Sequence, residues 1–232
     1  MTSEDDGDQT APAPGGEEAG TGECEVPFDL GSVDLVLSTT RSVRRRIDFE
    51  RPVERELLER CIELATQAPT GVIAESWRFL IVTDPARKAA VAEIYRRALE
   101  TFVEARGVEV KPAQRALAER LHEMPALILV CAEGRLLTNS APLQVGFYGS
   151  ILPAAWSLML ALRARGIGST WTSLHLLDES ETARVLGIPE NVTQTVLLPV
   201  GYTLGAVLKP ARRRPPREVI YWDEWGATRD AD

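Results

Sequence analysis

Two runs of basic residues, near opposite ends of the chain, are the side chains whose spacing most clearly implies chemistry. Arg41, Arg44, Arg45 and Arg46 fall within six residues, and Ser42 adds a hydroxyl beside the first. The second run comprises Lys209, Arg212, Arg213, Arg214 and Arg217. Like charges held together in a folded protein repel one another, which costs free energy unless a counter-charge is present. Guanidinium forks suit phosphate oxygens, so the two runs predict one shared anion, most simply a phosphate.

No other set of residues predicts catalysis by the protein itself. His122 and His175 are far apart in sequence and lack the spacing of metal ligands. His122 is expected on a helix surface, whereas His175 suits either ordinary packing or a cofactor contact. The three cysteines are too few and too scattered for a disulfide framework or a zinc site. Cys61 and Cys131 lie in apolar runs and are expected in the core, so we predict no metal site and no catalytic side chain.

The acidity of the chain belongs to its N-terminal end. The 232 residues carry a formal net charge of −8, with 34 acidic and 26 basic side chains. Residues 1–25 contain eight acids and no Lys or Arg, so the remainder has 34 − 8 = 26 acids against 26 bases. We predict that residues 1–27 are a disordered acidic tail, either an interaction segment or a solubilising leader. The tail lacks the pattern of a secretory signal, and the cysteine usage favours the cytoplasm.

Composition also bears on the partners of the chain. The part after the tail is near neutral and aromatic residues make up 6%, which argues against a nucleic-acid partner. Residues 145–162 form a stretch of eighteen residues without a charge, which is long enough to suggest a transmembrane helix. Pro153 within the stretch and the absence of a second span favour a buried central helix, at a core or a dimer interface. We therefore predict no membrane partner.

Alternating strand and helix patterns predict an α/β or α+β fold. We expect a single domain over residues 28–226 and a disordered end over 227–232. The expected helices span 32–39, 53–67, 84–105, 112–123, 145–162 and 178–186, and Asp178 is expected to cap the last of them. The expected strands span 78–83, 126–131, 169–174 and 192–202. The Pro- and Arg-rich end of the chain should form an extended arm.

Four elements, taken in order, resemble the flavin-dependent nitroreductase family. Ser42-Val43-Arg44-Arg45 resembles its N-terminal signature, and Ala68-Pro69-Thr70-Gly71 followed by Ser76-Trp77-Arg78-Phe79 resembles its Ala-Pro-Ser-Gly and Trp-Arg-Phe element. Gly166-Ile167-Gly168-Ser169 resembles its Gly-Leu-Gly-Thr turn, and Leu198-Pro199-Val200-Gly201-Tyr202 its closing strand. The resemblance covers residues 35 to 222.

The resemblance implies a three-layer α/β/α sandwich of the α+β class, with a central mixed sheet and a C-terminal arm that extends to a partner in a homodimer. It also implies FMN at the dimer interface. The residues that match cofactor-binding positions are Arg41, Ser42, Arg44, Arg45, Ser76, Lys209 and Arg213. Arg44 and Arg45 remain alternatives at the phosphate, because one extra residue stands between Ser42 and Val53.

Two departures from the family pattern affect the flavin ring. Ile73 stands where the family often has an Asn that contacts the flavin or the substrate. The family's common Ile-Glu-Gly near flavin N5 is replaced by Thr172, Ser173 and Leu174. A backbone N–H of Ser173 or Leu174 could still donate to N5, because this contact needs no particular side chain.

By resemblance, the expected activity is hydride transfer from NAD(P)H through FMN to a nitroaromatic, a quinone or a similar small electron-poor acceptor. Because the flavin performs the electron chemistry, the protein needs no acid, base or nucleophile of its own. Two alternatives stay open, a flavin-binding carrier or sensor and a specialised biosynthetic flavin oxidase or dehydrogenase.

Overall fold

Four strands form the central sheet of this computed structural model, which describes residues 28–70 and 75–228. Each strand pairs antiparallel with its neighbours. Parallel pairing occurs only as isolated bridges among the described residues, one of them between Ser42 and Ser169. The α+β prediction is confirmed, and the strands are antiparallel where a mixed sheet was expected. In spatial order they are β1 (Trp77–Val82), β2 (Ala126–Glu133), β4 (Val192–Tyr202) and β3 (Ile167–Ser169).

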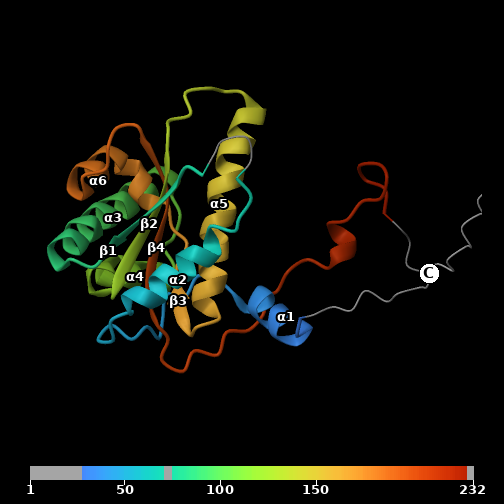
Figure 1. Ribbon diagram of the computed structural model, residues 1–232, viewed down its shortest axis with the longest axis horizontal. Helices are drawn as coiled ribbons and strands as arrows, with labels where there is room; N and C mark the ends of the chain where they lie inside the picture. The colour runs from blue at the N-terminus through green and yellow to red at the C-terminus, as the bar shows by residue number, and fades with distance from the viewer. Residues whose placement is uncertain (1–27, 71–74, 229–232) are drawn as a thin grey trace, which may run out of the picture.

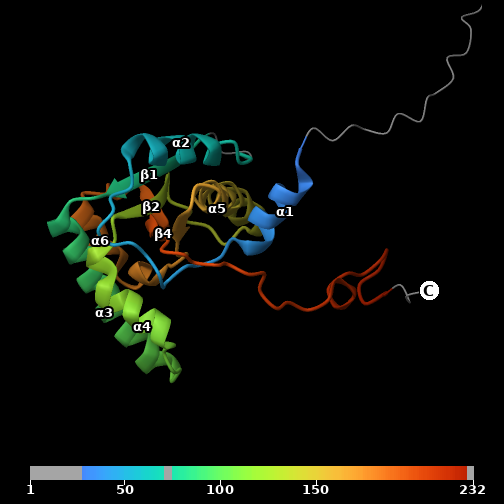
Figure 2. The same ribbon diagram turned by 90° about the horizontal axis from the view of Figure 1, so that it is seen from below.

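Helices cover both faces of the sheet and make the three layers (Figure 1). Alternate residues of β2 point to opposite faces, which is why both faces of this strand are apolar. Ile128 and Val130 join one core cluster, and Leu127 and Leu129 join the other. The first cluster packs under α2 (Arg55–Ala65) and α5 (Ala141–Arg163). The second packs under α3 (Pro85–Arg106), α4 (Pro112–Arg120) and α6 (Glu179–Leu186), on the other side of the sheet (Figure 2).

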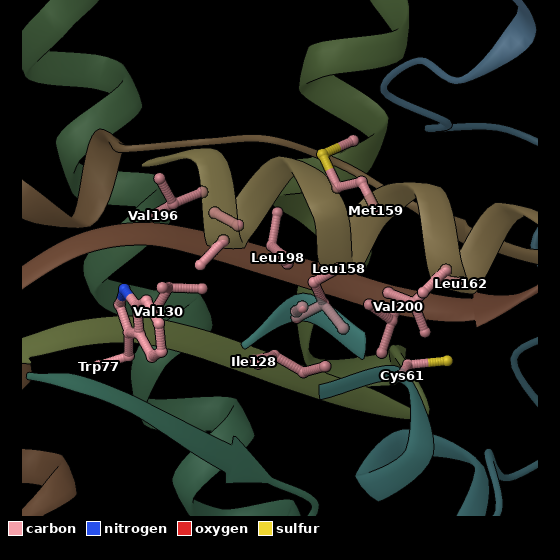
Figure 3. Packing of buried hydrophobic residues seen from close by; sticks show 14 of the residues in the cluster. Cys61, Trp77, Ile128, Val130, Leu158, Met159, Leu162, Val196, Leu198 and Val200 are labelled. Atoms are coloured by element: carbon pink, nitrogen blue, oxygen red, sulfur yellow. The ribbon is translucent and has the colours of Figure 1, made fainter. Parts of the chain in front are cut away.

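The first cluster packs α5 against the sheet. Leu158 and Leu162 of α5 are fully buried above the strands, opposite Ile128 and Leu198 (Figure 3). The indole Nε1 of Trp77 donates to Ser150 Oγ over 2.9 Å and so ties β1 to α5. Burying a Leu side chain contributes about 1.5–3 kcal/mol, so this layer fixes the position of α5 along the sheet. Cys61 and Cys131 are buried, as predicted.

Two segments leave the body on the same side. Helix α1 (Leu30–Thr39) begins at Asp29, whose carboxylate accepts from the Gly31 and Ser32 amides. The arm after β4 runs away from the sheet and contains one short 3₁₀ helix, Pro216–Glu218. Both views show α1 and the arm projecting together (Figures 1 and 2). The expected extended arm is therefore present.

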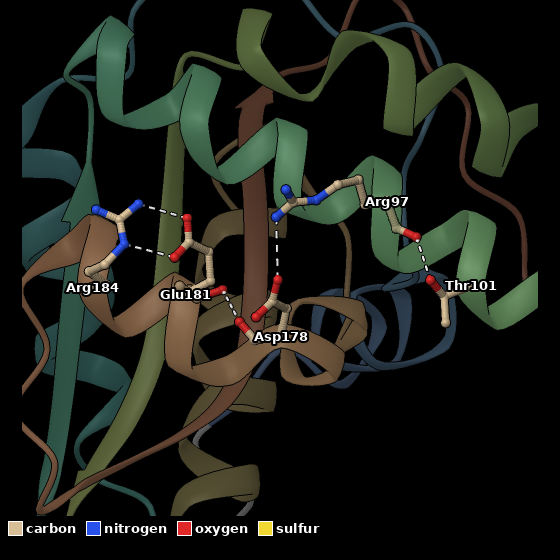
Figure 4. Close-up of polar contacts among 6 residues, drawn as sticks. Arg97, Thr101, Asp178, Glu181 and Arg184 are labelled. Carbon is tan, nitrogen blue, oxygen red and sulfur yellow. Dashed lines mark hydrogen bonds and ion pairs between the residues drawn. The ribbon is translucent and has the colours of Figure 1, made fainter.

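Two expectations near the end of β3 are wrong. The strand expected over 169–174 ends at Ser169, and Leu174–Asp178 is a 3₁₀ helix, η2. Asp178 makes no side-chain cap on α6, although a cap was predicted. Its carboxylate instead pairs with the Arg97 guanidinium of α3 over 3.3 Å (Figure 4). This contact across elements holds η2 against α3, which a local capping pattern could not reveal.

Helix α5 is longer than expected and begins at Ala141. It is the one helix of the described residues with the length and hydropathy of a membrane span, and 50% of its apolar window is buried. Its inner face packs on the sheet and on α2, while Leu143, Val145 and Trp156 are exposed. One face of the helix therefore lies in the core and the other lies at the surface.

Residues 1–27, 71–74 and 229–232 lie outside the described part of the chain. The predicted tail, Ile73 and the last four residues of the predicted disordered end are therefore not described. Ala227 and Thr228 are described, and the Ala227 carbonyl accepts from the Trp222 amide over 2.8 Å.

Candidate functional site

Segment 41–48, which carries the first arginine run, lies beside the ends of β3 and β4. The Val43 amide donates to the Ser169 carbonyl over 2.8 Å. Farther along, the Asp48 amide donates to the Tyr202 carbonyl, also over 2.8 Å. These bonds fix the segment at both ends, so the arginines between them project from a rigid backbone.

Two glycines allow the arginine segment to approach the sheet closely. Val43 and Ile47 turn inward and are 6% and 5% exposed. A Cβ on Gly168 would lie 3.2 Å from Val43 Cβ, and one on Gly201 only 2.8 Å from Ile47 Cγ2. These are the glycines of the Gly-Ile-Gly turn and of the closing strand. Their role here is close packing of backbone against side chain, which leaves Arg44, Arg45 and Arg46 facing outward.

Arg46 adopts a left-handed backbone with φ of 58°, which is uncommon for a residue other than glycine. Its carbonyl accepts from the Leu204 amide over 2.7 Å, and its guanidinium donates to the Gly205 carbonyl over 3.0 Å. This turn lies within the stretch between Ser42 and Val53 that has one residue more than the pattern it resembles. Arg46 is a residue of the site that the sequence analysis left out of its cofactor positions.

Two cavities share one wall at the start of this segment, formed by Arg41, Ser42 and Arg44. The large cavity, of about 730 Å³, also includes Lys209. The arm cavity, of about 550 Å³, also includes Arg213. The Arg41 guanidinium donates to the Lys209 carbonyl over 3.1 Å, so tertiary structure brings the two basic runs together.

The cations around these cavities lack counter-charges in the protein. Among the described residues, no acidic side chain pairs within 4.0 Å with any member of either basic run. Arginines elsewhere, such as Arg78 and Arg135, do form such pairs. The cluster is thus suited to an external anion, since arginine forks bind phosphate or carboxylate in a bidentate manner.

Arg44 and Arg45 differ in their surroundings. Arg44 is half-buried and lines both cavities, whereas Arg45 is exposed and lines the large cavity but not the arm cavity. The hydroxyl of Ser42 accepts from the Trp171 amide over 3.0 Å, which leaves its own proton free to donate. This geometry supports Arg44 over Arg45 for an anion bound at the shared wall.

A buried tyrosine lies behind the arginine wall. Tyr95 is 3% exposed, and its hydroxyl accepts from the Thr172 hydroxyl over 3.2 Å. Burial raises the pKa of Tyr95, while the Thr172 hydrogen bond and the positive charge of Arg44 oppose that rise. The phenol is therefore neutral at physiological pH and supplies no base to the site.

Three further predicted residues, Ser76, Ser173 and Leu174, do not line the two cavities at the arginine wall. Ser76 precedes β1, and its carbonyl accepts from the Glu133 amide over 2.8 Å. Ser173 is exposed and Leu174 packs against the second core cluster. None of the three lines the large cavity or the arm cavity. Their roles at a flavin ring stay predictions.

Trp156 is a site residue within the uncharged stretch 145–162, which the sequence analysis placed at a core or a dimer interface. It lies on α5, is 38% exposed and lines the arm cavity with Leu37 and Ser38 of α1. An uninterrupted apolar stretch did not indicate which of its faces would be open. The position of α1 beside α5 decides this.

The sequence profile described as the Nitroreductase family matches residues 37–202. This range includes the sheet, the arginine segment and every helix from α2 to α6. The chain therefore belongs to the nitroreductase family.

Several relatives and a solved structure are similar over most of the chain. Iodotyrosine deiodinase of Thermotoga neapolitana is 32% identical over 189 residues, which is 79% of this chain and 94% of that protein. A 5,6-dimethylbenzimidazole synthase of Rhodospirillum rubrum is 29% identical over 192 residues, 78% and 87% respectively. A crystal structure of iodotyrosine deiodinase bound to FMN and 3-iodo-L-tyrosine superposes with a TM-score of 0.61 and 28% identity, covering 79% of this chain and 96% of that one.

Proposed function

We propose that this protein is an FMN-dependent oxidoreductase that passes hydride from NAD(P)H to a small electron-poor aromatic acceptor. Membership of the nitroreductase family supports the class of reaction. Support for FMN as the cofactor comes from the similar structure that contains it. NAD(P)H as donor and a quinone or nitroaromatic as acceptor rest on the resemblance of the motifs.

The observation that carries the proposal is the wall of unpaired cations. Arg41, Arg44 and Lys209 meet at a cavity of about 730 Å³, within the usual range of about 300–1,000 Å³ for sites of cofactors and small ligands. A cofactor phosphate would supply the missing negative charge. The residues present thus fit the phosphate end of FMN.

Bound FMN would supply the electron chemistry, and the protein would supply binding and orientation. Arg41 and Arg44 would hold the phosphate in bidentate hydrogen bonds, and the Ser42 proton would donate to it or to the ribityl chain. Lys209 and Arg213 would close the site from the arm. Burial raises the pKa of Tyr95 behind this wall, so its neutral phenol would supply no base there.

Reductive dehalogenation of a halogenated aromatic is a second candidate. Its support is the 32% identity to an iodotyrosine deiodinase that the chain covers almost completely. In that reaction two electrons and a proton replace carbon–iodine with carbon–hydrogen and release iodide. Comparison of 3-iodotyrosine, a quinone and a nitroaromatic as acceptors, with iodide release measured directly, separates the two candidates.

A flavin carrier and a flavin oxidase are further candidates that the same assay separates. Robust NAD(P)H oxidation with an added quinone contradicts the carrier. Turnover with O2 as the acceptor, followed by product analysis, would identify a specialised oxidase or synthase. The similarity to a 5,6-dimethylbenzimidazole synthase supports this candidate.

A homodimer is part of the proposal. Large apolar side chains are exposed on α1, on α5 and along the arm, and α1 and the arm project together from the body (Figure 1). Many exposed large apolar side chains are typical of an interface. The side chains are Leu30, Leu35, Leu37, Leu143, Val145, Trp156, Val219, Ile220, Tyr221 and Trp225.

The decisive experiment combines spectroscopy with two substitutions. Purified protein should show a flavin absorption spectrum near one FMN per chain, and anaerobic NADPH or NADH should bleach it. Arg41→Ala and Arg213→Ala should each weaken FMN binding, because a hydrogen bond to a charged group contributes about 1.5–3 kcal/mol.

Arg115→Ala, on the far side of α4, is the matched control and should leave FMN affinity unchanged. If the double variant Arg41→Ala with Arg213→Ala bound FMN as tightly as the unaltered protein, the phosphate assignment would be wrong. A flavin that does not bleach would contradict NAD(P)H as the donor.

A further inference from the structure

A third cavity lies between the arginine segment and helix α4, and we refer to it as the α4 cavity. Its volume is about 230 Å³, below the range of about 300–1,000 Å³ typical of drug-sized ligands. A flavin or a dinucleotide is therefore too large for it. Its lining residues are Arg44, Arg45, Arg46, Ile47, Phe49, Ala116, Leu117, Arg120 and Met124.

The floor of the α4 cavity is apolar. Ile47, Leu117 and Met124 are buried to within 5% exposure, and they belong to the second core cluster. At one side the Arg120 guanidinium carbon lies 3.8 Å from the centre of the Phe49 ring. An apolar floor beside a stacked guanidinium and aromatic ring favours a ligand with a flat apolar body.

The rim is positively charged and incompletely neutralised. Arg45 makes no ion pair with any described residue. Of the nearby acids, Glu123 is bound to Arg120, with Nε to Oε2 at 2.9 Å. The Asp48 carboxylate accepts from the Glu50 and Arg51 amides, both at 3.1 Å. Both acids are thus engaged elsewhere, and the charge of Arg45 is left for a ligand.

We infer that the α4 cavity binds a small organic carboxylate, with its carboxylate on Arg45 and its apolar body on the Ile47 and Leu117 floor. The bidentate fork of arginine matches the two carboxylate oxygens. A fully polar anion such as inorganic phosphate would leave the floor without a partner. The proposed site therefore selects an anion that is charged at one end only.

The α4 cavity adjoins the large cavity, and Arg44, Arg45 and Arg46 line both. The other residues of the proposed phosphate site, Arg41, Ser42, Lys209 and Arg213, do not line the α4 cavity. The arginine run contains more guanidinium groups than one phosphate can bind, so Arg45 is available to a second anion in the α4 cavity. The inference does not depend on which cofactor the large cavity holds.

Calorimetric titration with benzoate tests the inference. We expect one benzoate to bind per chain of FMN-saturated protein, and benzyl alcohol and inorganic phosphate to bind far more weakly. Ala116→Leu should abolish benzoate binding, because the larger side chain occupies the cavity. Arg45→Gln should weaken it on the order of tenfold or more through loss of a charge-assisted bond.

Arg115→Gln is the matched control, since this exposed arginine of α4 lines a different groove, and it should bind benzoate as the unaltered protein does. Arg45 is exposed, so its substitution tests the site even if Ala116→Leu lowers stability. Absence of benzoate binding, binding that survives both substitutions, or phosphate binding in preference to benzoate would each overturn the inference. Titration of FMN-free protein with benzoate separates the two proposals. Benzoate binding there would support the α4 cavity even if the proposed FMN function were wrong.

Discussion

The imidazole of His175 lies fully inside the protein, on the 3₁₀ helix η2 between the sheet and α3. Neither ring nitrogen has a hydrogen-bond partner among the described residues. Burial lowers its pKa from 6.5 to about 4, because the interior disfavours the charged ring. His175 also lines neither the large cavity nor the arm cavity, which supports packing over cofactor contact.

This histidine should make the protein sensitive to mild acid. Its folded-state pKa lies below the unfolded value, so the unfolded chain takes up the proton first as the pH falls. The stability is therefore complete above about pH 6.5 and declines as the pH falls toward 4. Between pH 7 and pH 5 the expected loss in the free energy of unfolding is about 2 kcal/mol.

Urea denaturation of the unaltered protein and of His175→Leu at both pH values measures this component. The variant should lose less stability between pH 7 and pH 5 than the unaltered protein. An equal loss in the two proteins would mean that His175 does not titrate in this window. His122→Leu is the control, since His122 is exposed.

At the scale of elements, the arginine segment depends on the two glycines beneath it. Gly201 is in β4, where a Cβ would lie 2.8 Å from Ile47 Cγ2 and 3.0 Å from Pro125 Cδ. Both neighbours are packed against the sheet, so the segment would have to shift outward. The glycines of the family motifs thus position the cations indirectly.

Gly201→Ala should therefore lower both stability and FMN affinity. Overpacking of this kind costs about 1–3 kcal/mol in the free energy of unfolding, and displacement of Ile47 would move Arg44 and Arg46. Thermal unfolding and FMN titration measure the two effects. Ser180→Ala, at an exposed position of α6, is the control and should lower neither quantity. Full FMN affinity in Gly201→Ala would refute the link.

Several elements were predictable from local pattern because their signals are local. The strand expected over 192–202 is found with those bounds, and the helix that begins after Asp84 is capped by that residue, with Arg87 N to Oδ1 at 2.9 Å. The segment after β3 was not predictable in the same way. The named strand ends at Ser169, although Thr172 still bridges Leu197 of β4, and the chain then enters η2, which packs on α3.

At the scale of the whole molecule, the arm and α1 carry many of the exposed large apolar side chains. Trp225 is 93% exposed and Val207 is 78% exposed. The Tyr221 and Trp225 rings lie 5.0 Å apart, so the end of the arm presents a small aromatic cluster away from the body. A second copy of the chain would cover it.

Removal of residues 218–232 should therefore weaken the dimer while it leaves the Arg213 position intact. Light scattering at micromolar concentration should report a dimer for the full chain and a larger monomer fraction for the shortened one. Removal of residues 229–232 alone is the control and should preserve the dimer. A monomeric full chain would contradict the proposed dimer.

The sequence by itself determined the chemistry that is available here: two basic runs, the motifs of the nitroreductase family, and alternating apolar patterns that give a sheet with helices on both faces. These are local properties, and composition and periodicity record them directly. Only the tertiary structure decided that Arg41 meets Lys209, that Arg46 contacts Gly205, and that Arg45 also lines the α4 cavity. The first two outcomes depend on contacts across more than 150 positions of the chain, and the third depends on the packing of α4 beside the arginine segment.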